Sequence, residues 1–385
     1  MRVLVDFTQV PRNRTGAGVY AENLVRELIL KFKGTEDILF LLVQEDEERI
    51  RRIAEESPNV VVVSIGAKLF RNRALLLLYE QLVLPFLLLR KRIDLVHSLH
   101  YTHPLVSPCA RLVTIHDLTF LLFPELHTFA RRLIMPFFIR RAVRHADGLV
   151  FDSIASYVDA QKLIPTTKGN LRRITPLGVA WQEFNGNEHN GRGVLEKFSI
   201  EKPFLLFVGT IEPRKNIARL IWAFELLANE FPDLLLVIAG KPGWHFEKVF
   251  SAMRNSEHRS RIRYLNFITD AEKKTLLSAC AALAYPSLYE GFGLPILEGM
   301  AAGAPVITGN VSSLPEVAGD AAILIDPFSV EQLADAIRTV LRDPAKRDRL
   351  SALGRKQAAA FSWARTATLT FEAYRDVVKN QSSRR

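Results

Sequence analysis

The sequence has 385 residues, of which 48% are hydrophobic and 24% charged, and this composition excludes a largely disordered chain. Its length exceeds what one hydrophobic core usually supports, so two domains are expected. A formal net charge of +10 leaves nucleic acid, an anionic membrane surface and phosphate-bearing substrates as possible partner classes. The sequence has no helix-turn-helix, zinc-finger or aromatic–basic RNA motif, which disfavours nucleic acid.

Cysteine usage and the first residues bear on the cellular compartment. Cys109 and Cys280 lie far apart and form no Cys-x-x-Cys pair, which fits a reducing cytoplasm. The chain enters a strand pattern at once, and its first apolar run is too short for the core of a signal peptide. We therefore expect a cytoplasmic protein, and a peripheral position at the inner face of the cell membrane stays open.

The amino-terminal half alternates apolar runs of strand length with helical patterns. The strands are expected at 3–7, 38–43, 60–65, 95–97, 112–115 and 149–151. Such alternation is typical of a parallel sheet with helices on both faces. A polar stretch at 185–193, rich in turn formers, marks the expected junction between the domains.

Gly16 and Gly18 follow the first strand in a G-x-G-x-x-A pattern. A nicotinamide dinucleotide is disfavoured, because its fingerprint needs the glycines directly after the strand and residues 8–15 intervene. Two interpretations are left: a glycine loop whose backbone N–H groups close over a ligand, or an ordinary helix start.

An apolar stretch at 74–89 lies between basic residues. These are Lys68, Arg71, Arg73, Arg90, Lys91 and Arg92. The stretch is shorter than the roughly 20 residues of a membrane-spanning helix, and Glu80, Gln81 and Pro85 interrupt it. It is either a buried helix that covers the sheet or a basic, apolar surface helix that contacts anionic lipid.

Polar side chains stand at the ends of several of these strands, where parallel sheets bind ligands. His116 and Asp117 follow the strand at 112–115, but adjacent side chains on a strand point to opposite faces, so they do not form a dyad. Ser153 either caps the next helix or touches a substrate.

His97, His100 and Tyr101 lie at the end of the strand at 95–97 and are candidates for lining a substrate site. The spacing to His103 also suggests a metal. Pro104 indicates an irregular loop, however, so a zinc site is disfavoured.

The carboxyl-terminal half repeats the alternation. Its strands are expected at 204–208, 234–239, 262–267, 281–285, 305–308 and 322–325, and its last helices at 330–341, 345–361 and 363–379. The predicted fold is α/β, with two doubly wound domains and a cleft between them.

A glycine and two cations follow the strand at 204–208, in the run Gly209-Thr210-Ile211-Glu212-Pro213-Arg214-Lys215-Asn216. Arginine offers a planar fork and lysine a compact point charge, and together they could neutralise a diphosphate. The alternative is a solvated basic pair at a helix start.

Two carboxylates surround a glycine-rich turn in the run Glu290-Gly291-Phe292-Gly293-Leu294-Pro295-Ile296-Leu297-Glu298. The N–H groups of such a turn attract phosphate or a polarised sugar oxygen. Glu298, expected in the first helical turn, could accept hydrogen bonds from both hydroxyls of a ribose, and Glu290 from one hydroxyl of a sugar. Alternatively, Glu298 complements the helix dipole and Glu290 is a solvated loop acid.

These two motifs together resemble the retaining glycosyltransferases of family 4, and the resemblance extends over essentially the whole chain. It implies a GT-B fold with domains at 1–185 and 194–362 and a final helix, 363–385, that crosses back to the first domain. It also implies transfer of a hexosyl group from a nucleoside diphosphate sugar to a glycan or lipid-linked glycan hydroxyl, in cell-surface polysaccharide synthesis. The loop at 209–216 is similar to that of bacterial mannosyltransferases, so GDP-mannose is the first donor to test.

The resemblance implies roles for individual residues. Glu298 would bind the donor ribose, Glu290 and His116 would approach the donor sugar, and Arg214 and Lys215 would bind the diphosphate. The further donor-binding positions are Gly16, Gly18, Gly209, Gly291, Phe292, Gly293 and Leu294. The acceptor-side positions are His97, His100, Tyr101 and Ser153.

We expect no cofactor and no metal, because no Asp-x-Asp motif ends a strand and the two cations can neutralise the leaving group. The expected partners are a nucleotide sugar, a glycan or lipid-linked oligosaccharide and an anionic membrane surface, without nucleic acid. The rival hypotheses are a sugar-nucleotide epimerase or a phosphorylase on the same scaffold, and a basic binding protein without turnover.

Overall fold

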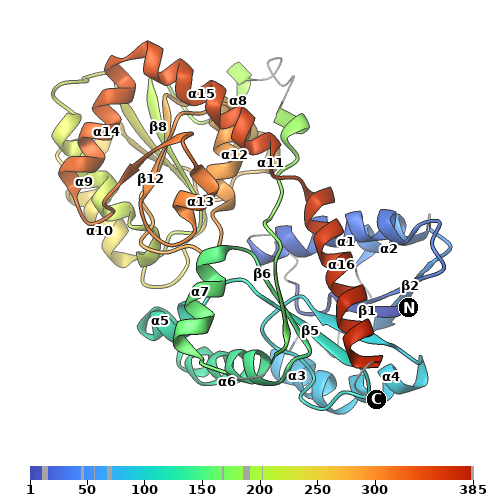
Figure 1. Cartoon of the computed structure of the whole chain (residues 1–385). Helices are drawn as coiled ribbons and strands as arrows, with labels where there is room; N and C mark the ends of the chain where they lie inside the picture. Colours follow the sequence, from blue (N-terminus) through green and yellow to red (C-terminus); the bar gives the residue numbers. More distant parts are fainter. Residues whose placement is uncertain are drawn as a thin grey trace. The chain divides into compact units, whose positions relative to one another are not determined.

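The computed structural model describes residues 1–10, 16–44, 47–55, 57–66, 72–166, 169–184, 191–201 and 203–382. The chain divides into two compact units (Figure 1). Unit 1 contains Met1–Gly178 and Ser362–Arg385, and unit 2 contains Val179–Phe361. The first junction therefore precedes the polar stretch at 185–193, of which residues 185–190 lie outside the described part.

Unit 1 is built on a parallel sheet with the strand order β3-β2-β1-β4-β5-β6-β7. Its strands are β1 (Arg2–Asp6), β2 (Ile38–Gln44), β3 (Val60–Ile65), β4 (Leu95–Ser98), β5 (Ala110–Ile115), β6 (Gly148–Phe151) and β7 (Leu171–Ile174). The central strands are apolar on both faces because helices cover both sides.

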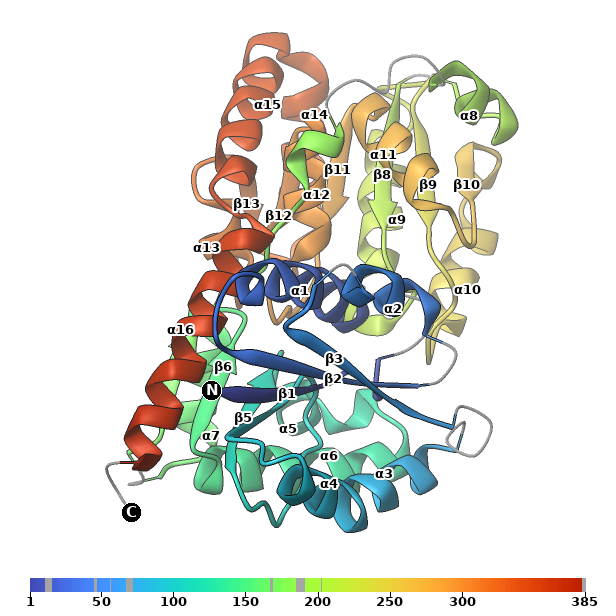
Figure 2. The same ribbon diagram turned by 90° about the vertical axis from the view of Figure 1, so that its right-hand side faces the viewer.

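The helices of unit 1 form two layers around this sheet (Figure 2). They are α1 (Ala17–Phe32), α2 (Glu48–Glu55), α3 (Arg73–Leu82), α4 (Leu84–Arg90), α5 (Thr119–Leu122), α6 (Phe129–His145), α7 (Ile154–Leu163) and α16 (Trp363–Ser382). Helices α1 and α16 pack together on one face, where Phe32 meets Phe371 edge to face with 5.1 Å between ring centroids. Helices α3, α4 and α6 cover the other face.

Strand β7 is absent from the sequence-based expectation. Its sequence is Leu-Arg-Arg-Ile, and the structure leaves all four residues half-buried at the sheet edge, so the apolar run that predicts a strand is missing. Arg173 instead pairs with Glu372 and Asp376 of α16 at 3.0 and 2.5 Å. The returning helix thus supplies the carboxylates for this strand.

The apolar stretch at 74–89 forms two helices, α3 and α4, that meet at Val83. One side covers the sheet through Leu76, Leu84 and Leu88. The opposite side is exposed and still apolar. The interpretation as a helix that covers the sheet therefore describes one side, and contact of the exposed side with lipid stays a prediction.

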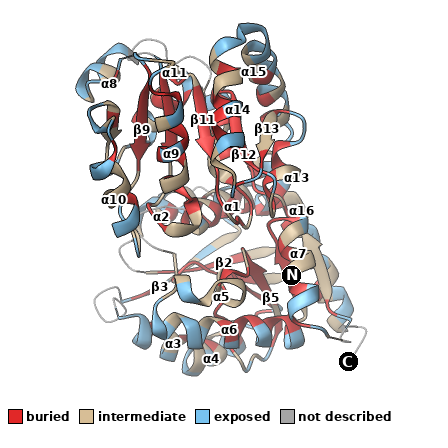
Figure 3. Ribbon diagram, turned by 90° about the vertical axis from the view of Figure 1, so that its left-hand side faces the viewer, coloured by how far each residue is buried: buried red, intermediate tan, exposed pale blue. Residues whose placement is uncertain are grey.

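Unit 2 has a parallel sheet with the order β10-β9-β8-β11-β12-β13. Its strands are β8 (Phe204–Val208), β9 (Leu235–Ala239), β10 (Ile262–Tyr264), β11 (Ala282–Tyr285), β12 (Val306–Gly309) and β13 (Ala322–Ile325). Its helices are α8 (Gly191–Lys197), α9 (Ile217–Leu227), α10 (Glu247–Asn255), α11 (Asp270–Ala279), α12 (Leu294–Ala302), α13 (Leu314–Ala318), α14 (Val330–Arg342) and α15 (Pro344–Ala359). Helices α9 and α14 pack together on one face and α11 with α12 on the other, and the sheet between them is buried (Figure 3). The predicted pair of doubly wound α/β domains is confirmed.

The chain passes between the units at two adjacent points. The N–H of Val179 donates to the carbonyl of Phe361 at 3.1 Å. A side chain at Gly178 would collide with the backbone of Trp363, so only glycine permits this approach. Helix α16 then packs entirely within unit 1.

Candidate active site

The two sequence motifs of unit 2 come together at one edge of its sheet. Strands β8 and β11 are neighbours, and the strand order reverses between them, which is where open α/β sheets bind ligands. The loop after β8 carries Arg214 and Lys215, and the loop after β11 carries Glu290. The two loops are joined directly, because the N–H of Leu288 donates to the carbonyl of Arg214 at 2.9 Å.

The basic loop has a fixed backbone. Pro213–Lys215 forms a short 3₁₀ turn, and Asn216 follows it in the left-handed conformation with φ of 60°. The Asn216 amide donates to the carbonyls of Pro286 and Pro327 at 3.0 and 2.6 Å. Asparagine tolerates this conformation better than most residues, and its two hydrogen bonds hold the loop against its neighbours.

Arg214, Lys215 and Glu290 form a buried ion network. One carboxylate oxygen of Glu290 lies 2.6 Å from Lys215 Nζ and the other 2.8 Å from Arg214 Nη1. Arg214 Nη2 also pairs with Glu212 at 2.6 Å, and Lys215 Nζ donates to the Tyr285 hydroxyl. Two cations and two carboxylates thus neutralise one another.

The network shifts the pKa values of its members. Burial raises the pKa of Glu290, but Arg214 and Lys215 lower it by more, to about 2. Burial is also the largest effect on Lys215 and lowers its pKa. Glu290 is therefore ionised at neutral pH and remains a hydrogen-bond acceptor.

The second carboxylate of the acidic motif lies in a separate ion pair. Glu298 accepts from Lys273 Nζ at 2.6 Å, and both side chains are mostly buried. Glu298 is the fifth residue of α12, so its placement in the first helical turn was wrong. The helix starts at Leu294 because Gly293, with φ of 112°, adopts the left-handed conformation that precedes it.

The turn between the two carboxylates is held by serines. The hydroxyl of Ser313 donates to the carbonyls of Glu290 and Phe292 at 2.9 and 2.7 Å, and the Glu290 N–H donates to the Ser312 hydroxyl at 2.9 Å. Gly291 and Phe292 lie within this pinned turn, and Leu294 opens the helix. Gly209 directly follows β8 with its N–H bonded to the carbonyl of Ala239 at 2.9 Å.

In unit 1, His116 lies between two acceptors. Its Nδ1 is 2.7 Å from the Asp152 carboxylate, and its Nε2 is 3.0 Å from the carbonyl of Leu99. Both ring nitrogens can donate only in the imidazolium form. Burial lowers the pKa of His116, but Asp152, the Leu99 carbonyl and Asp117 together raise it by more, and the net shift is upward.

His97 requires a correction. Its side chain is fully buried, with ring nitrogens 2.8 Å from the hydroxyls of Tyr374 and Thr114. Burial lowers its pKa to about 3, so the ring is neutral. His97 joins α16 to the sheet rather than facing a substrate, and its position on a buried strand gave no sign of this partner.

The other predicted positions of unit 1 lie near His116 or at helix starts. The rings of His100 and Tyr101 meet His116 edge to face at 6.0 and 5.9 Å. Ser153 caps α7, since its hydroxyl accepts from the Ser156 N–H at 3.0 Å. Gly16 precedes α1 with φ of 44°, and Gly18 is buried in its first turn.

Sequence reasoning missed four residues of these sites: Glu212, Tyr285, Lys273 and Asp152. Glu212 stands inside the basic motif, so its charge was a usable signal. Tyr285 and Asp152 end or follow strands next to motif loops. Lys273 had no signal, because only the packing of α11 on α12 brings it to Glu298.

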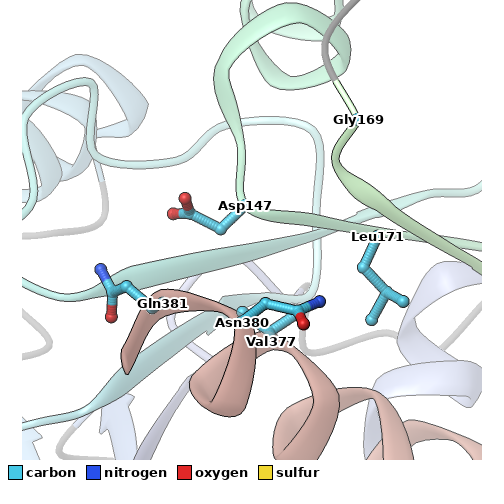
Figure 4. A pocket seen from close by; sticks show the side chains of 6 residues that line it. All are labelled: Asp147, Gly169, Leu171, Val377, Asn380 and Gln381. Atoms are coloured by element: carbon cyan, nitrogen blue, oxygen red, sulfur yellow. The ribbon is translucent and has the colours of Figure 1, made fainter. Parts of the chain in front are cut away.

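Two other candidate sites in unit 1 carry less weight: a small hollow, and the metal site that the spacing of His97, His100 and His103 suggested. A small hollow lined by Asp147, Gly169, Leu171, Val377, Asn380 and Gln381 lies where β6 and β7 begin, at the edge opposite to the one that binds ligands (Figure 4). Among the described residues, no three His, Cys, Asp or Glu side chains gather as metal ligands.

Comparison with known families identifies the domain that holds the ion network. Residues 196–357 match the model for glycosyl transferases group 1. This part of the chain belongs to that family. The group 1 domain thus includes both motifs of the candidate site and confirms the resemblance on which the expectations rested.

Curated relatives of this glycosyltransferase domain include mannosyltransferases. The O-antigen chain mannosyltransferase B of Escherichia coli is 35% identical over 187 residues, which cover 47% of this chain and 48% of the relative. The serotype-specific mannosyltransferase WbdA of Escherichia coli is 35% identical over 186 residues, which cover 46% of this chain and 22% of the relative. The chain therefore spans less than half the length of these relatives.

A solved structure matches both units. Sucrose-phosphate synthase from Thermosynechococcus elongatus aligns over 98% of this chain and 99% of its own, with a TM-score of 0.77 and 18% identity. At this identity the likeness shows the fold alone, and it confirms the predicted GT-B fold.

Proposed function

We propose that this protein is a retaining mannosyltransferase that transfers mannose from GDP-mannose to a hydroxyl of a glycan or lipid-linked glycan. The observation that carries the proposal is the Arg214–Lys215–Glu290 network at the strand-order reversal of a group 1 domain. The names of the O-antigen and serotype-specific relatives favour mannose and a role in cell-surface polysaccharide synthesis.

The network suggests how the donor is bound. Arg214 and Lys215 are neutralised by carboxylates in the free protein, so an incoming diphosphate must replace Glu290 as their partner. The released Glu290 carboxylate then becomes an acceptor for a hydroxyl of the donor sugar. As the glycosidic bond breaks, the two cations stabilise the charge that develops on the departing diphosphate.

Glu298 and Lys273 are proposed to hold the nucleoside. Lys273 fixes one oxygen of the Glu298 carboxylate at 2.6 Å. The other oxygen has the acceptor capacity to bind ribose hydroxyls. The donor roles of Gly209, Gly291, Phe292, Gly293 and Leu294 rest on their places in the same turns.

A surface of unit 1 supports contact with a membrane. Helices α3, α4 and α6 lie side by side on one face of its sheet, and much of their outer side is exposed (Figure 3). Large apolar residues are among these exposed positions. Phe86 and Phe129 are 73% and 76% exposed. The other exposed apolar residues of this face are Leu75, Leu78, Leu82, Val83, Leu89, Leu133, Ile134 and Phe137.

The charges on this helical face favour an anionic bilayer as its partner. Helix α6 contains five arginines and no acidic residue, and α3 and α4 are flanked by Arg73, Arg90, Lys91 and Arg92. Apolar side chains bordered by cations match the boundary between lipid headgroups and acyl chains. No helix among the described residues is long and apolar enough to cross a membrane. We therefore propose peripheral attachment at the cytoplasmic face, where a lipid-linked acceptor would be available.

The donor can be identified by thermal shift with GDP, UDP, ADP and dTDP. A ligand that binds only the native state raises the melting temperature, and we expect GDP to give the largest rise. Incubation with GDP-mannose and an acceptor should then give an α-linked product, as read from the anomeric proton by NMR. Conversion of the sugar nucleotide without acceptor would instead indicate an epimerase.

A further inference from the structure

A second polar cluster lies at the strand-order reversal of unit 1. The order reverses between β1 and β4, which end at Asp6 and Ser98. These two residues are register partners, so their side chains lie on the same face of the sheet. Leu4 and Val96, two residues earlier, contact the core beneath α3 and α4, which places Asp6 and Ser98 on that face as well.

Glu80 of α3 extends this cluster, one helical turn beyond the core residue Leu76. Glu80 is 2% exposed, and Asp6 is close enough to raise its pKa, after the larger effect of burial. Asp6 Oδ1 accepts from the N–H and hydroxyl of Thr8 at 2.9 and 2.6 Å. The Gln9 amide donates a long hydrogen bond, 3.4 Å, to Glu80 Oε2.

Several buried atoms of the cluster have no hydrogen-bond partner among the described residues. Glu80 Oε1, Thr102 Oγ1 and Ser98 Oγ find no hydrogen-bond partner in the described part of the chain. Thr102 is close enough to Glu80 to lower its pKa, although the two do not meet with hydrogen-bond geometry. Buried polar atoms nearly always have partners, so a ligand or water is expected here.

The chemistry of the cluster selects the ligand. Two carboxyl groups disfavour an anion such as phosphate. Burial raises the pKa of both Asp6 and Glu80 and so favours their neutral, donating forms. Carboxyl, hydroxyl and amide groups together match the hydroxyls of a sugar, which donate and accept at once.

We propose that Asp6, Glu80 and Thr102 form a subsite for hydroxyl groups of the acceptor glycan, at the strand-order reversal of unit 1. This proposal rests on the proposed transferase function and adds the residues that bind its acceptor. Glu80 binds the acceptor through hydrogen bonds and needs no charge to do so.

The test compares Glu80→Leu and Glu80→Gln with the wild-type protein. Methyl α-mannoside and α-linked mannobioses serve as acceptor probes, with the donor chosen by thermal shift. Leucine removes the hydrogen bonds, so we expect the KM for the acceptor to rise about ten- to hundredfold, whereas glutamine keeps it within about threefold. The KM for the donor and the slow hydrolysis of donor without acceptor should not change.

Stability provides the second measurement. Glu80→Leu removes a buried carboxyl group that has one long hydrogen bond and one oxygen without a partner among the described residues, so its melting temperature should rise. The matched control is Glu22→Leu, because Glu22 is also buried in unit 1 but pairs with Arg49 at 3.0 Å. This control should lower the melting temperature and leave the KM for the acceptor unchanged.

The outcomes separate the two proposals. If the Glu80→Leu protein had a lower melting temperature and an unchanged KM for the acceptor, Glu80 would have a structural role only. This result would overturn the proposed acceptor subsite. Binding of nucleoside diphosphate without transfer to any of the probes by the wild-type protein would overturn the glycan assignment. Failure to bind any nucleoside diphosphate would instead refute the proposed function itself.

Discussion

At the scale of single residues, Glu290 is the most informative side chain of the candidate site. It contacts both cations that the sequence assigns to a diphosphate, at 2.6 and 2.8 Å. If the two cations bind a diphosphate as proposed, the Glu290 carboxylate competes with it for them. Binding of the donor and rearrangement of Glu290 should therefore be coupled.

Substitutions at this network should separate donor binding from transfer. Lys215→Met removes a charge-assisted partner of the diphosphate and should weaken binding of the nucleoside diphosphate about ten- to hundredfold. Glu290→Gln removes the competing charge, so binding should tighten severalfold while transfer falls by at least about a hundredfold. Isothermal titration calorimetry and product formation measure the two effects. Equal weakening of binding in both variants would contradict the exchange of partners.

The same network predicts a pH dependence of stability. The folded-state pKa of Glu290 is about 2, below its ordinary value of 4.5, so its stabilising contribution is complete above about pH 5 and is lost as pH falls toward 2. The contribution is on the order of 3 kcal/mol. Urea unfolding at pH 7 should show Glu290→Gln to be less stable than the wild-type protein, and the difference should shrink toward pH 2.5. A difference that is constant with pH would show that Glu290 does not titrate in this way.

At the scale of elements, the pairing of α11 with α12 completes the site. Helix α11 begins with a capping box, in which Thr269 and Glu272 exchange hydrogen bonds. This fixed start places Lys273 in the first turn, facing Glu298. Burial lowers the pKa of Lys273, but Glu298 and Asp270 together raise it by more, which keeps the amine charged.

Lys273 should therefore act as a positioning residue for Glu298, the carboxylate that we propose to bind the ribose. Lys273→Met should raise the KM for the donor about tenfold and reduce the preference for GDP over 2′-deoxy-GDP, with a smaller effect on kcat. The neighbouring Lys274 pairs with Glu183 instead, so Lys274→Met is the matched control. Loss of ribose discrimination in the control as well would refute the assignment.

The comparison of sequence and structure is also clearest at this scale. Apolar runs such as Phe204–Val208 predict buried strands because burial on both faces demands continuous apolarity. The edge strand β7 lacked that pattern, since it contains two arginines, of which Arg173 pairs with α16 from the far end of the chain. The motif residues Arg214, Lys215 and Glu290 were found from strand ends and spacing. The partner Lys273 depends on a tertiary contact between α11 and α12, which no local pattern encodes.

At the scale of the whole molecule, exposed apolar residues and arginines are concentrated on one helical face of unit 1. The exposed apolar residues of α3, α4 and α6 stand among many arginines, whereas α9 of unit 2, which carries the exposed Trp222 and Leu226, has one arginine and one glutamate. A bilayer supplies both an apolar phase and negative charge. The helical face of unit 1 matches these two properties together.

Flotation with vesicles tests this match. The wild-type protein should bind vesicles that contain phosphatidylglycerol, bind phosphatidylcholine vesicles weakly, and dissociate as salt increases. Combined Phe86→Ser and Phe129→Ser substitution should reduce binding about tenfold or more, because it removes two aromatic rings that would be buried at the boundary with the acyl chains. Combined Trp222→Ser and Leu226→Ser substitution should have no effect. Equal binding by all variants would show that this face does not contact the membrane.

The mutual neutralisation of Arg214, Lys215, Glu212 and Glu290 has a consequence for selectivity in the cell. Orthophosphate, which is abundant in cytoplasm, lacks the nucleoside and sugar contacts that would offset the loss of the internal ion pairs. The donor-free protein should thus resist inhibition by millimolar phosphate, even though the proposed function has its donor bound through phosphates.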